Sequence, residues 1–149
     1  IPDSVTIIID EAFIGCTALE SVVFGHGIST IGDIFQGCTR LKSVTIPNNV
    51  TYISETAFLY CGTSYVIYGN RDSYAETFAK ENDIQFIVFY VMGDIDLDGL
   101  ATIQDVTLMQ RYCADEIETI EAPVSYVDVD GNDSIDINDA TAIQRLLVE

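Results

Sequence analysis

Acidic residues recur at short, regular intervals in the last part of the chain. From Asp94 the sequence reads DIDLDGLATIQD, which places carboxylates at Asp94, Asp96, Asp98 and Asp105. Oxygens from alternate residues of a tight turn can surround one ion, and a hard cation is the ion that takes so many oxygen ligands. The spacing is that of a calcium-binding loop, in which a divalent ion offsets the mutual repulsion of the carboxylates.

A second copy of this pattern begins at Asp128 with DVDGNDSIDIND, at a constant offset of 34 residues from the first. Magnesium fits less well than calcium, because it demands octahedral geometry and gives up its water reluctantly. We therefore expect two structural Ca²⁺ ions. Their expected ligands are side-chain oxygens, with a backbone carbonyl at the seventh loop position and a direct or water-mediated contact at the ninth: Asp94, Asp96, Asp98, Leu100, Thr102 and Asp105 in the first loop, and Asp128, Asp130, Asn132, Ser134, Asp136 and Asp139 in the second.

The second loop departs from the first at its sixth position, where Asp133 replaces Gly99. This position usually requires a positive φ, which aspartate tolerates better than most residues other than glycine. We expect the second loop to bind calcium, with an affinity that can be lower than that of the first.

The elements that must position these loops repeat along with them. Matching residues continue beyond each loop at helical spacing, which predicts one helix after each loop. An apolar segment precedes Asp94, and Pro123 lies shortly before Asp128, so neither loop has the preceding helix of a full EF-hand. One face of the first helix carries Val106, Met109 and Cys113, which we expect to meet the second helix.

The segments GDIDLDGLATIQDVTLMQRY and VDVDGNDSIDINDATAIQRL together resemble the dockerin family over their whole length. The resemblance implies a protein partner, the cohesin module, and contact residues at loop positions 10 and 11 and helix positions 17 and 18. With the threonine that shares each helix face, these are Ile103, Gln104, Thr107, Gln110 and Arg111, and Ile137, Asn138, Thr141, Gln144 and Arg145.

Two alternatives stay open for this face. Ile103 and Ile137 could be core residues and not contact residues. They stand where many dockerins carry a small hydroxyl residue, which leaves the specificity class for the cohesin open. If both are exposed, the two similar helices could bind a cohesin in two orientations related by a pseudo-twofold axis.

The first ninety residues contain a different repeat, with a period of 22 to 23 residues. Such a period, with an apolar strand in each turn, predicts a solenoid whose coils bury their apolar sides against their neighbours. The segments AFIGCTALESVVF and IFQGCTRLKSVTI resemble leucine-rich repeats of the BspA-like type. Corresponding positions are Val5, Ile28 and Val50; Ile8, Ile31 and Ile53; Phe13, Phe35 and Phe58; and Cys16, Cys38 and Cys61, which we expect to be buried, reduced thiols.

The third coil lacks the leucine that corresponds to Leu19 and Leu41, which indicates the end of the array. We expect a cap from residues 71–90: a helix capped by Asp72 or Ser73, with Tyr74, Phe78 and alanines on its apolar face, and then a strand over 84–91 covered on both sides. The first coil has no such cap, so further repeats are expected upstream of it.

Charge separates the two repeats. The chain carries a net charge of −18, of which residues 1–90 contribute −6 and residues 91–149 contribute −12. Nucleic acid and anionic membranes would repel such a chain, and no apolar run is long enough for membrane insertion. We therefore expect an α+β protein with two domains. Residues 1–90 should form a leucine-rich-repeat solenoid with a helix and strand cap, and residues 91–149 a small all-α dockerin with two calcium loop-helix units. We expect the solenoid to pack directly on the dockerin, like the X-modules that accompany some dockerins.

The expected function is calcium-dependent docking of a secreted protein to a cohesin on a cellulosome-type scaffold or a cell surface, where it would serve polysaccharide degradation. Extracellular calcium is abundant enough to fill such sites. The alternative is an adhesin, in which the repeats bind a surface protein or polysaccharide and calcium merely stabilises the chain. An enzyme is not expected, because the acidic spacing is committed to metal shells without an open position.

Overall fold

The computed structural model describes residues 1–62 and 64–148, and it contains both helices and strands, as expected of an α+β protein. The chain divides into two compact units, Ile1–Phe89 and Tyr90–Glu149, each with its own buried apolar cluster. No helix among the described residues is long and apolar enough to cross a membrane.

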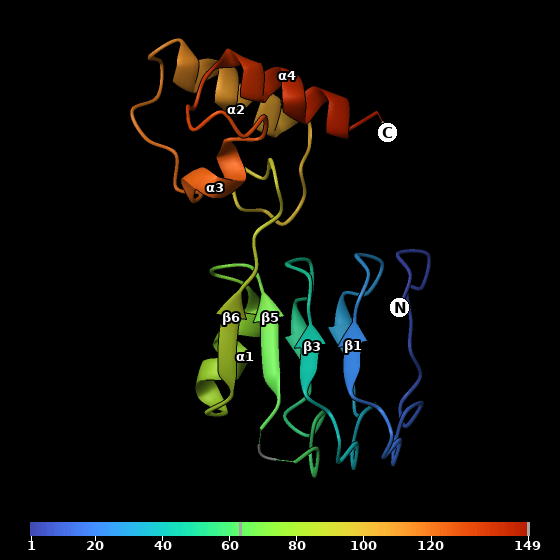
Figure 1. The fold of residues 1–149 in the computed structure, drawn as a ribbon. Coiled ribbons are helices and arrows are strands. Elements are labelled where there is room, and N and C mark those ends of the chain that lie inside the picture. Colours follow the sequence, from blue (N-terminus) through green and yellow to red (C-terminus); the bar gives the residue numbers. More distant parts are fainter. Residues whose placement is uncertain (63, 149) are drawn as a thin grey trace. The chain divides into compact units, whose positions relative to one another are not determined.

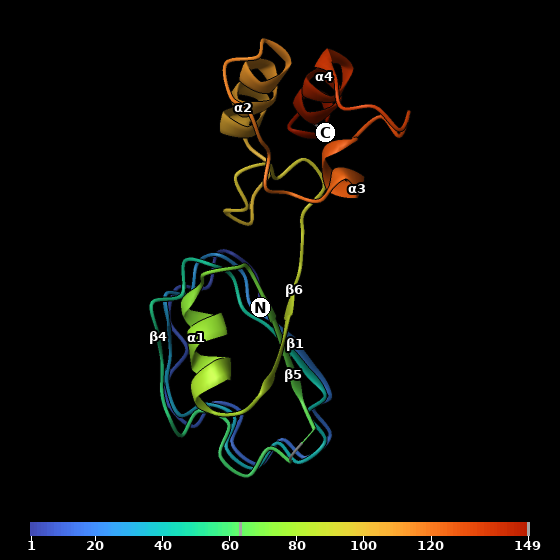
Figure 2. The same cartoon turned by 90° about the vertical axis from the view of Figure 1, so that its left-hand side faces the viewer.

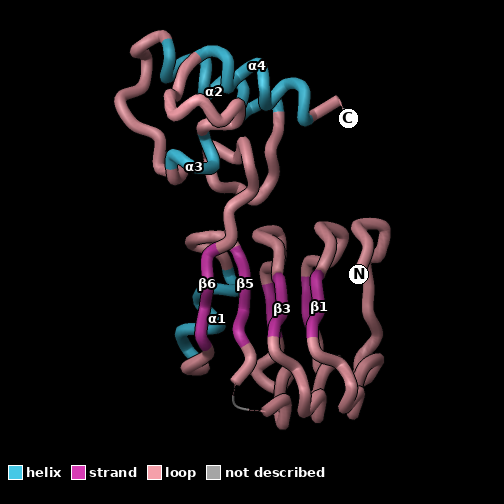
Figure 3. Tube along the Cα trace, in the orientation of Figure 1, coloured by secondary structure: helices cyan, strands magenta, loops and turns pink. Residues whose placement is uncertain are grey.

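The first unit is built from coils that place short parallel strands side by side (Figures 1 and 3). Four strands form one sheet in the order β1 (Ser21–Val23), β3 (Ser43–Thr45), β5 (Val66–Gly69) and β6 (Gln85–Val88). On the opposite side of the coils, β2 (Thr30–Ile31) pairs with β4 (Tyr52–Ile53). Figure 2 looks along the stack, where successive coils follow nearly the same path.

The repeated apolar positions meet in the interior of these coils. Val22, Val44 and Ile67 are in register on β1, β3 and β5, and all three are buried. Phe35 stacks between Phe13 and Phe58, with ring centroids 5.4 and 5.7 Å away. Each coil therefore buries its apolar side against the next coil, as the period of the sequence predicts.

The cysteines of the repeat are free thiols, and two of the three are buried. The thiols of Cys38 and Cys61 donate hydrogen bonds to the carbonyls of Phe13 and Phe35 in the preceding coil, at 3.2 and 2.9 Å. Burial raises the pKa of Cys38 to about 11. The prediction that Cys16 is buried is wrong: Cys16 is exposed, because among the described residues only the second coil packs against the first.

The cap helix forms where expected, as α1 (Tyr74–Glu81) with Ser73 as its N-cap. The Ser73 hydroxyl accepts a hydrogen bond from the Glu76 amide at 3.2 Å. The buried residues of the helix are Ala75, Phe78 and Ala79, whereas Tyr74 is exposed. Tyr74 was expected on the apolar face, but the small alanines at i and i+4 let the helix approach the sheet and leave Tyr74 at the margin.

The strand after the cap helix is shorter and more exposed than predicted. β6 covers Gln85–Val88, where a strand over 84–91 was expected. Gln85 and Ile87 are exposed, whereas Phe86 and Val88 are half-buried. The expectation that this strand is covered on both sides is therefore wrong. It is the last strand of the sheet, and within the first unit only its inner face meets the core.

The second unit contains the helices α2 (Ile103–Cys113), α3 (Val124–Val127) and α4 (Ile137–Leu146). α2 and α4 pack against each other through a core that includes Val106, Met109, Ala140 and Ile143. Cys113 was expected in this contact but is exposed, because it lies at the last residue of α2. The single turn of α3 was not predicted; it begins directly after Pro123, whose fixed φ suits the start of a helix.

Candidate functional site: two acidic loops and the helices that follow them

The first acidic loop is held by hydrogen bonds from backbone amides to its own carboxylates. The Asp94 carboxylate accepts from the amides of Asp98 and Gly99 at 3.0 and 2.9 Å. The Asp98 amide also donates to Asp96 at 3.1 Å, and the Leu100 amide donates to the Asp98 carboxylate at 2.9 Å. These bonds curl the backbone around its acidic side chains, so that several carboxylates face a common centre.

The last acid of each loop joins the loop to the helix that follows. Asp105 accepts from the Ile95 and Thr102 amides at 2.7 and 2.6 Å, and Asp139 accepts from the Val129 and Asp136 amides at 2.8 Å each. Both carboxylates are fully buried. Each is therefore a fixed link between the start of its loop and the first turn of its helix.

Thr102 and Asp136, which the sequence predicts as cation ligands, are the N-caps of α2 and α4. The Thr102 hydroxyl accepts from the Gln104 amide at 3.2 Å, and the Asp136 carboxylate accepts from the Asn138 amide at 2.7 Å. With the last acid of the loop at the third helical position, each makes a capping box. The patterns T-x-x-D at Thr102 and D-x-x-D at Asp136 are present in the sequence and could have predicted that these residues cap the helices.

The second loop reproduces the bonds of the first. Asp128 accepts from the Asn132 and Asp133 amides at 3.0 and 2.8 Å, and Asp130 accepts from the Asn132 amide at 3.2 Å. The Ser134 amide donates to the Asn132 side-chain oxygen at 2.8 Å, as Leu100 does to Asp98. The offset of 34 residues in the sequence therefore corresponds to two loops of the same local geometry.

The loops share two positions with a left-handed backbone. At the sixth position φ is +93° in Gly99 and +64° in Asp133, as the loop pattern predicts. At the fourth position φ is +61° in Leu97 and +73° in Gly131. The positive φ at the fourth position was not predicted, because leucine, which the first loop has there, rarely adopts it. Only the glycine of the second loop indicates it in the sequence.

Ligand atoms from three acids converge in each loop. Carboxylate oxygens of Asp94, Asp96 and Asp98 lie within 4.8 Å of one another, and so do those of Asp128, Asp130 and Asp139. Three carboxylates so close together repel one another unless a cation lies among them. The donor set consists of hard oxygens, which is the set that Ca²⁺ prefers. The residues present therefore fit a divalent cation, and the contribution of each individual ligand stays a prediction.

The environment of Asp94 makes its charge costly. Burial raises the pKa of Asp94 to about 6, although the hydrogen bond from the Gly99 amide opposes the rise. The neighbouring acidic side chains raise the pKa of Asp94 further. The pKa of Asp96 is also raised, mainly by burial. A cation in the loop would favour the ionised carboxylates and reverse this tendency.

The residues predicted to contact a partner lie on the outer surfaces of α2 and α4. Ile103 is 58% exposed and Ile137 is 53% exposed, so the alternative that they are core residues is wrong. The other eight are also exposed: Gln104, Thr107, Gln110, Arg111, Asn138, Thr141, Gln144 and Arg145. The Thr107 and Thr141 hydroxyls bond to the Ile103 and Ile137 carbonyls on their own helices.

Arg111 makes one ion pair on this surface. Its Nε lies 3.3 Å from a carboxylate oxygen of Glu116, and both side chains are about half exposed or more. An exposed pair of this kind contributes little to stability. Breaking the Arg111–Glu116 pair would therefore cost little free energy, which leaves the guanidinium group of Arg111 available for other contacts.

Comparison with protein families assigns both parts of the chain. A six-copy model of the BspA type leucine rich repeat region matches residues 1–91, and the Dockerin type I domain matches residues 92–148. The chain belongs to the BspA type leucine-rich-repeat family and carries a dockerin type I domain after its repeats. No curated protein and no solved structure matches it.

Proposed function

We propose that residues 91–149 bind a cohesin module in a calcium-dependent manner, and that they anchor an extracellular protein to a cellulosome-type scaffold or a cell surface. The observation that carries this proposal is the duplicated arrangement of an acidic loop and an exposed helix face within a dockerin type I match. Fifty to sixty residues bury only a thin core, so cation binding would supply much of the folding free energy.

The acidic loops would hold two structural Ca²⁺ ions. Asp94, Asp96 and Asp98 would supply ligands in the first loop, and Asp128, Asp130 and Asp139 in the second. Bound calcium would supply the positive charge that keeps these carboxylates together. The buried Asp105 and Asp139 side chains, bonded to both loop and helix, would transmit this order to the first turns of α2 and α4.

The exposed faces of α2 and α4 would contact the cohesin. Ile103 and Ile137 would provide an apolar patch, and the flanking amide and guanidinium groups of Gln110, Arg111 and their counterparts would donate hydrogen bonds to acidic or carbonyl groups. Because the two faces carry nearly the same residues, we propose that either can bind. Unequal losses of affinity in Arg111→Ala and Arg145→Ala would show that one orientation dominates.

We propose that this chain acts by binding and not by catalysis. The convergent carboxylates of the second unit are bonded to amides of their own loops, an arrangement that suits a structural cation better than a reacting substrate. An extracellular setting is proposed because calcium there is abundant enough to fill loops of this kind.

The proposal is tested by capture of the whole chain on a panel of immobilised cohesin modules, first in calcium and then in EDTA. We expect one class of cohesin to capture the chain in calcium, and we expect EDTA to abolish the capture. Failure in both conditions, with calcium uptake confirmed by calorimetry, would favour the alternative of a calcium-stabilised adhesin.

A further inference from the structure

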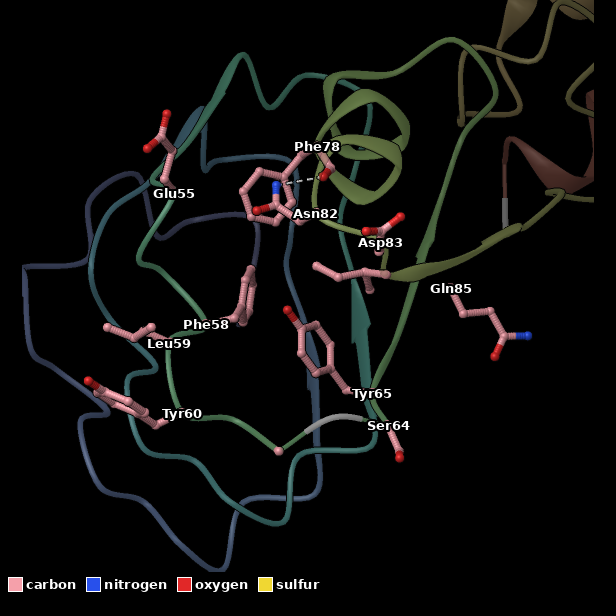
Figure 4. Close-up of a pocket in the computed structure, with 12 residues that line it drawn as sticks. Glu55, Phe58, Leu59, Tyr60, Ser64, Tyr65, Phe78, Asn82, Asp83 and Gln85 are labelled. Carbon is pink, nitrogen blue, oxygen red and sulfur yellow. Dashed lines mark hydrogen bonds between the residues drawn. The ribbon is translucent and has the colours of Figure 1, made fainter.

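A pocket of about 660 Å³ lies at the end of the coil stack, between the third coil and the cap helix α1 (Figure 4). Phe58, Tyr65 and Phe78 face its centre, and Tyr60 lies at its margin. Phe58 is 5.4 Å from Tyr65 and 6.1 Å from Phe78 between ring centroids. Phe58 and Phe78 are buried, at 6% and 5% exposed, so the aromatic surface that a ligand can reach comes mainly from Tyr65 and Tyr60.

The third coil departs from the repeat at the residues that form this pocket. The leucine at the position of Leu19 and Leu41 is replaced by Ser64, which removes an apolar side chain from the end of the core. Tyr65 stands where the earlier coils have Glu20 and Lys42. The pocket is therefore a property of this coil and not of the repeat.

Tyr60 is the strongest of these departures. Its counterparts, Gly15 and Gly37, adopt φ of +66° and +73°, and Tyr60 keeps this left-handed backbone with φ of +62°. A side chain in this conformation costs free energy that glycine does not. Tyr60 is 75% exposed, so its burial within the unit does little to offset this cost. Because the backbone strain at Tyr60 occurs at the edge of a pocket, it suggests that the Tyr60 side chain has a function there.

The polar groups of the pocket limit what can bind in it. Among the described residues its lining contains no Lys, Arg or His, whereas Glu55 and Asp83 contribute carboxylates, so an anionic ligand would be repelled. Asn82 donates its side-chain amide to the Phe78 carbonyl at 2.8 Å, which leaves its Oδ1 as an acceptor. Burial raises the pKa of Tyr65, so its hydroxyl stays a neutral donor.

We propose that this pocket binds a neutral saccharide. The C–H face of a pyranose ring would pack on the aromatic surface, with Tyr60 as its exposed platform, and the sugar hydroxyls would donate to the carboxylates and to Asn82 and accept from Tyr65. All the lining residues belong to the first unit, so the proposal does not depend on cohesin binding by the second.

The test measures binding of soluble cello-, xylo- and manno-oligosaccharides to the whole chain, by calorimetry and saturation-transfer NMR. The chain has eight tyrosines and no tryptophan, so tyrosine fluorescence gives an additional signal. We expect at least one neutral oligosaccharide to bind, and we expect neither an oligogalacturonate, which is anionic, nor choline, which is cationic, to compete with it.

Two variants replace a residue of the third coil by the one found at the same position in the earlier coils, and both should weaken or abolish saccharide binding. Tyr60→Gly should raise the melting temperature, because it relieves the backbone strain, and lower saccharide affinity by at least about tenfold. Ser64→Leu should abolish binding by filling the pocket. Tyr52→Ala is the matched control, since Tyr52 is 52% exposed on β4 of the same coil but lies outside the pocket, and it should bind normally.

Three results would overturn the proposal. One is the absence of binding by all three neutral oligosaccharide types. Another is unchanged affinity in Tyr60→Gly and Ser64→Leu. The third is binding of oligogalacturonate or choline in place of the neutral sugars. Capture by a cohesin should be the same for wild type and Tyr60→Gly, which separates this proposal from the docking function.

Discussion

Asp133 adopts a left-handed backbone where the first loop has Gly99, with φ of +64° and +93°. We predict that Asp133→Gly raises the free energy of unfolding of the second unit by about 1 kcal/mol, because glycine adopts this conformation without steric cost. It should also tighten the weaker of two calcium-binding steps, since a loop without this strain closes more readily. Isothermal calorimetry with calcium and thermal unfolding check the two effects.

Asp115→Gly is a matched control for this change. Asp115 follows α2 with φ of +57° and lies outside both loops. Its replacement should raise the melting temperature to a similar degree and leave both calcium affinities unchanged. If the two variants changed calcium affinity equally, the sixth position of the loop would have no special role.

Ile103 and Ile137 allow a second prediction at the residue scale. Ile103→Asp and Ile137→Asp together should lower cohesin affinity by at least about tenfold, because they place charge in an apolar contact, with little change in unfolding. Surface plasmon resonance against the captured cohesin measures the change. Val124→Asp is the control: Val124 is as exposed as Ile103, at 58%, but lies on α3. An equal loss in Val124→Asp would contradict the assignment of the face.

Sequence spacing predicts the convergence of Asp94, Asp96 and Asp98 and of Asp128, Asp130 and Asp139, because the positions in a tight loop fix the directions of their side chains. Asp105 was expected in the first group as well, but it is not among the three acids whose oxygens lie within 4.8 Å of one another. Sequence spacing predicts less well what else the loop residues do. Thr102 and Asp136 were expected as ligands only, yet each caps a helix. Exposure of Ile103 and Ile137 could not be decided from the sequence, since an isoleucine at helical spacing fits a core as well as a surface.

Among the elements of the first unit, the phenylalanine stack should carry much of the stability. Phe35 is fully buried and contacts the rings of Phe13, Phe24 and Phe58. We predict that Phe35→Ala lowers the free energy of unfolding of this unit by about 3–5 kcal/mol, because it leaves a cavity between two coils. Phe13→Ala should cost clearly less, since Phe13 has a stacked neighbour on one side only. Urea unfolding, followed by circular dichroism, compares them; equal costs would contradict the stacking argument.

The sequence predicted elements best where a periodic pattern coincided with a boundary residue. The period of the coils and the Ser73 cap of α1 are examples. It failed where burial depends on how many neighbours an element has. The run of apolar residues over 84–91 reads as a doubly covered strand, but β6 lies at the end of its sheet and has one exposed face. α3 was missed because four residues are too few for a helical period.

For the whole molecule, calcium removal should affect the two units differently. Both acidic clusters lie in the second unit, and each unit has its own core. We predict that removing calcium with EDTA lowers the free energy of unfolding of the second unit by about 3 kcal/mol or more for each loop that was saturated with calcium. NMR signals from Val106 and Ile143 should broaden or shift, whereas those of Val44 and Ile67 should persist. Loss of both sets of signals at the same EDTA concentration would contradict independent cores.

The uneven distribution of charge along the sequence predicts the division of the chain into two units. The acid-rich residues after 90 contribute −12 of the net −18, and many of their carboxylates lie in the two acidic loops. The acids of the coils are partly matched by bases, as in the Glu20 pairs with Arg40 and Lys42 at 2.8 Å. The pocket beside α1 could not be foreseen in this way, since it depends on how the third coil ends.

The four free cysteines are divided between the units in a way that is useful experimentally. Cys38 and Cys61 are buried in the coils, whereas Cys16 in the first unit and Cys113 in the second are exposed. A maleimide dye should therefore label two positions of the folded, unmodified chain, one in each unit, and two more after denaturation. These residues of the chain thus supply a donor and an acceptor site for resonance energy transfer, and a change in transfer efficiency on adding calcium or cohesin would report movement between the units without any engineered mutation.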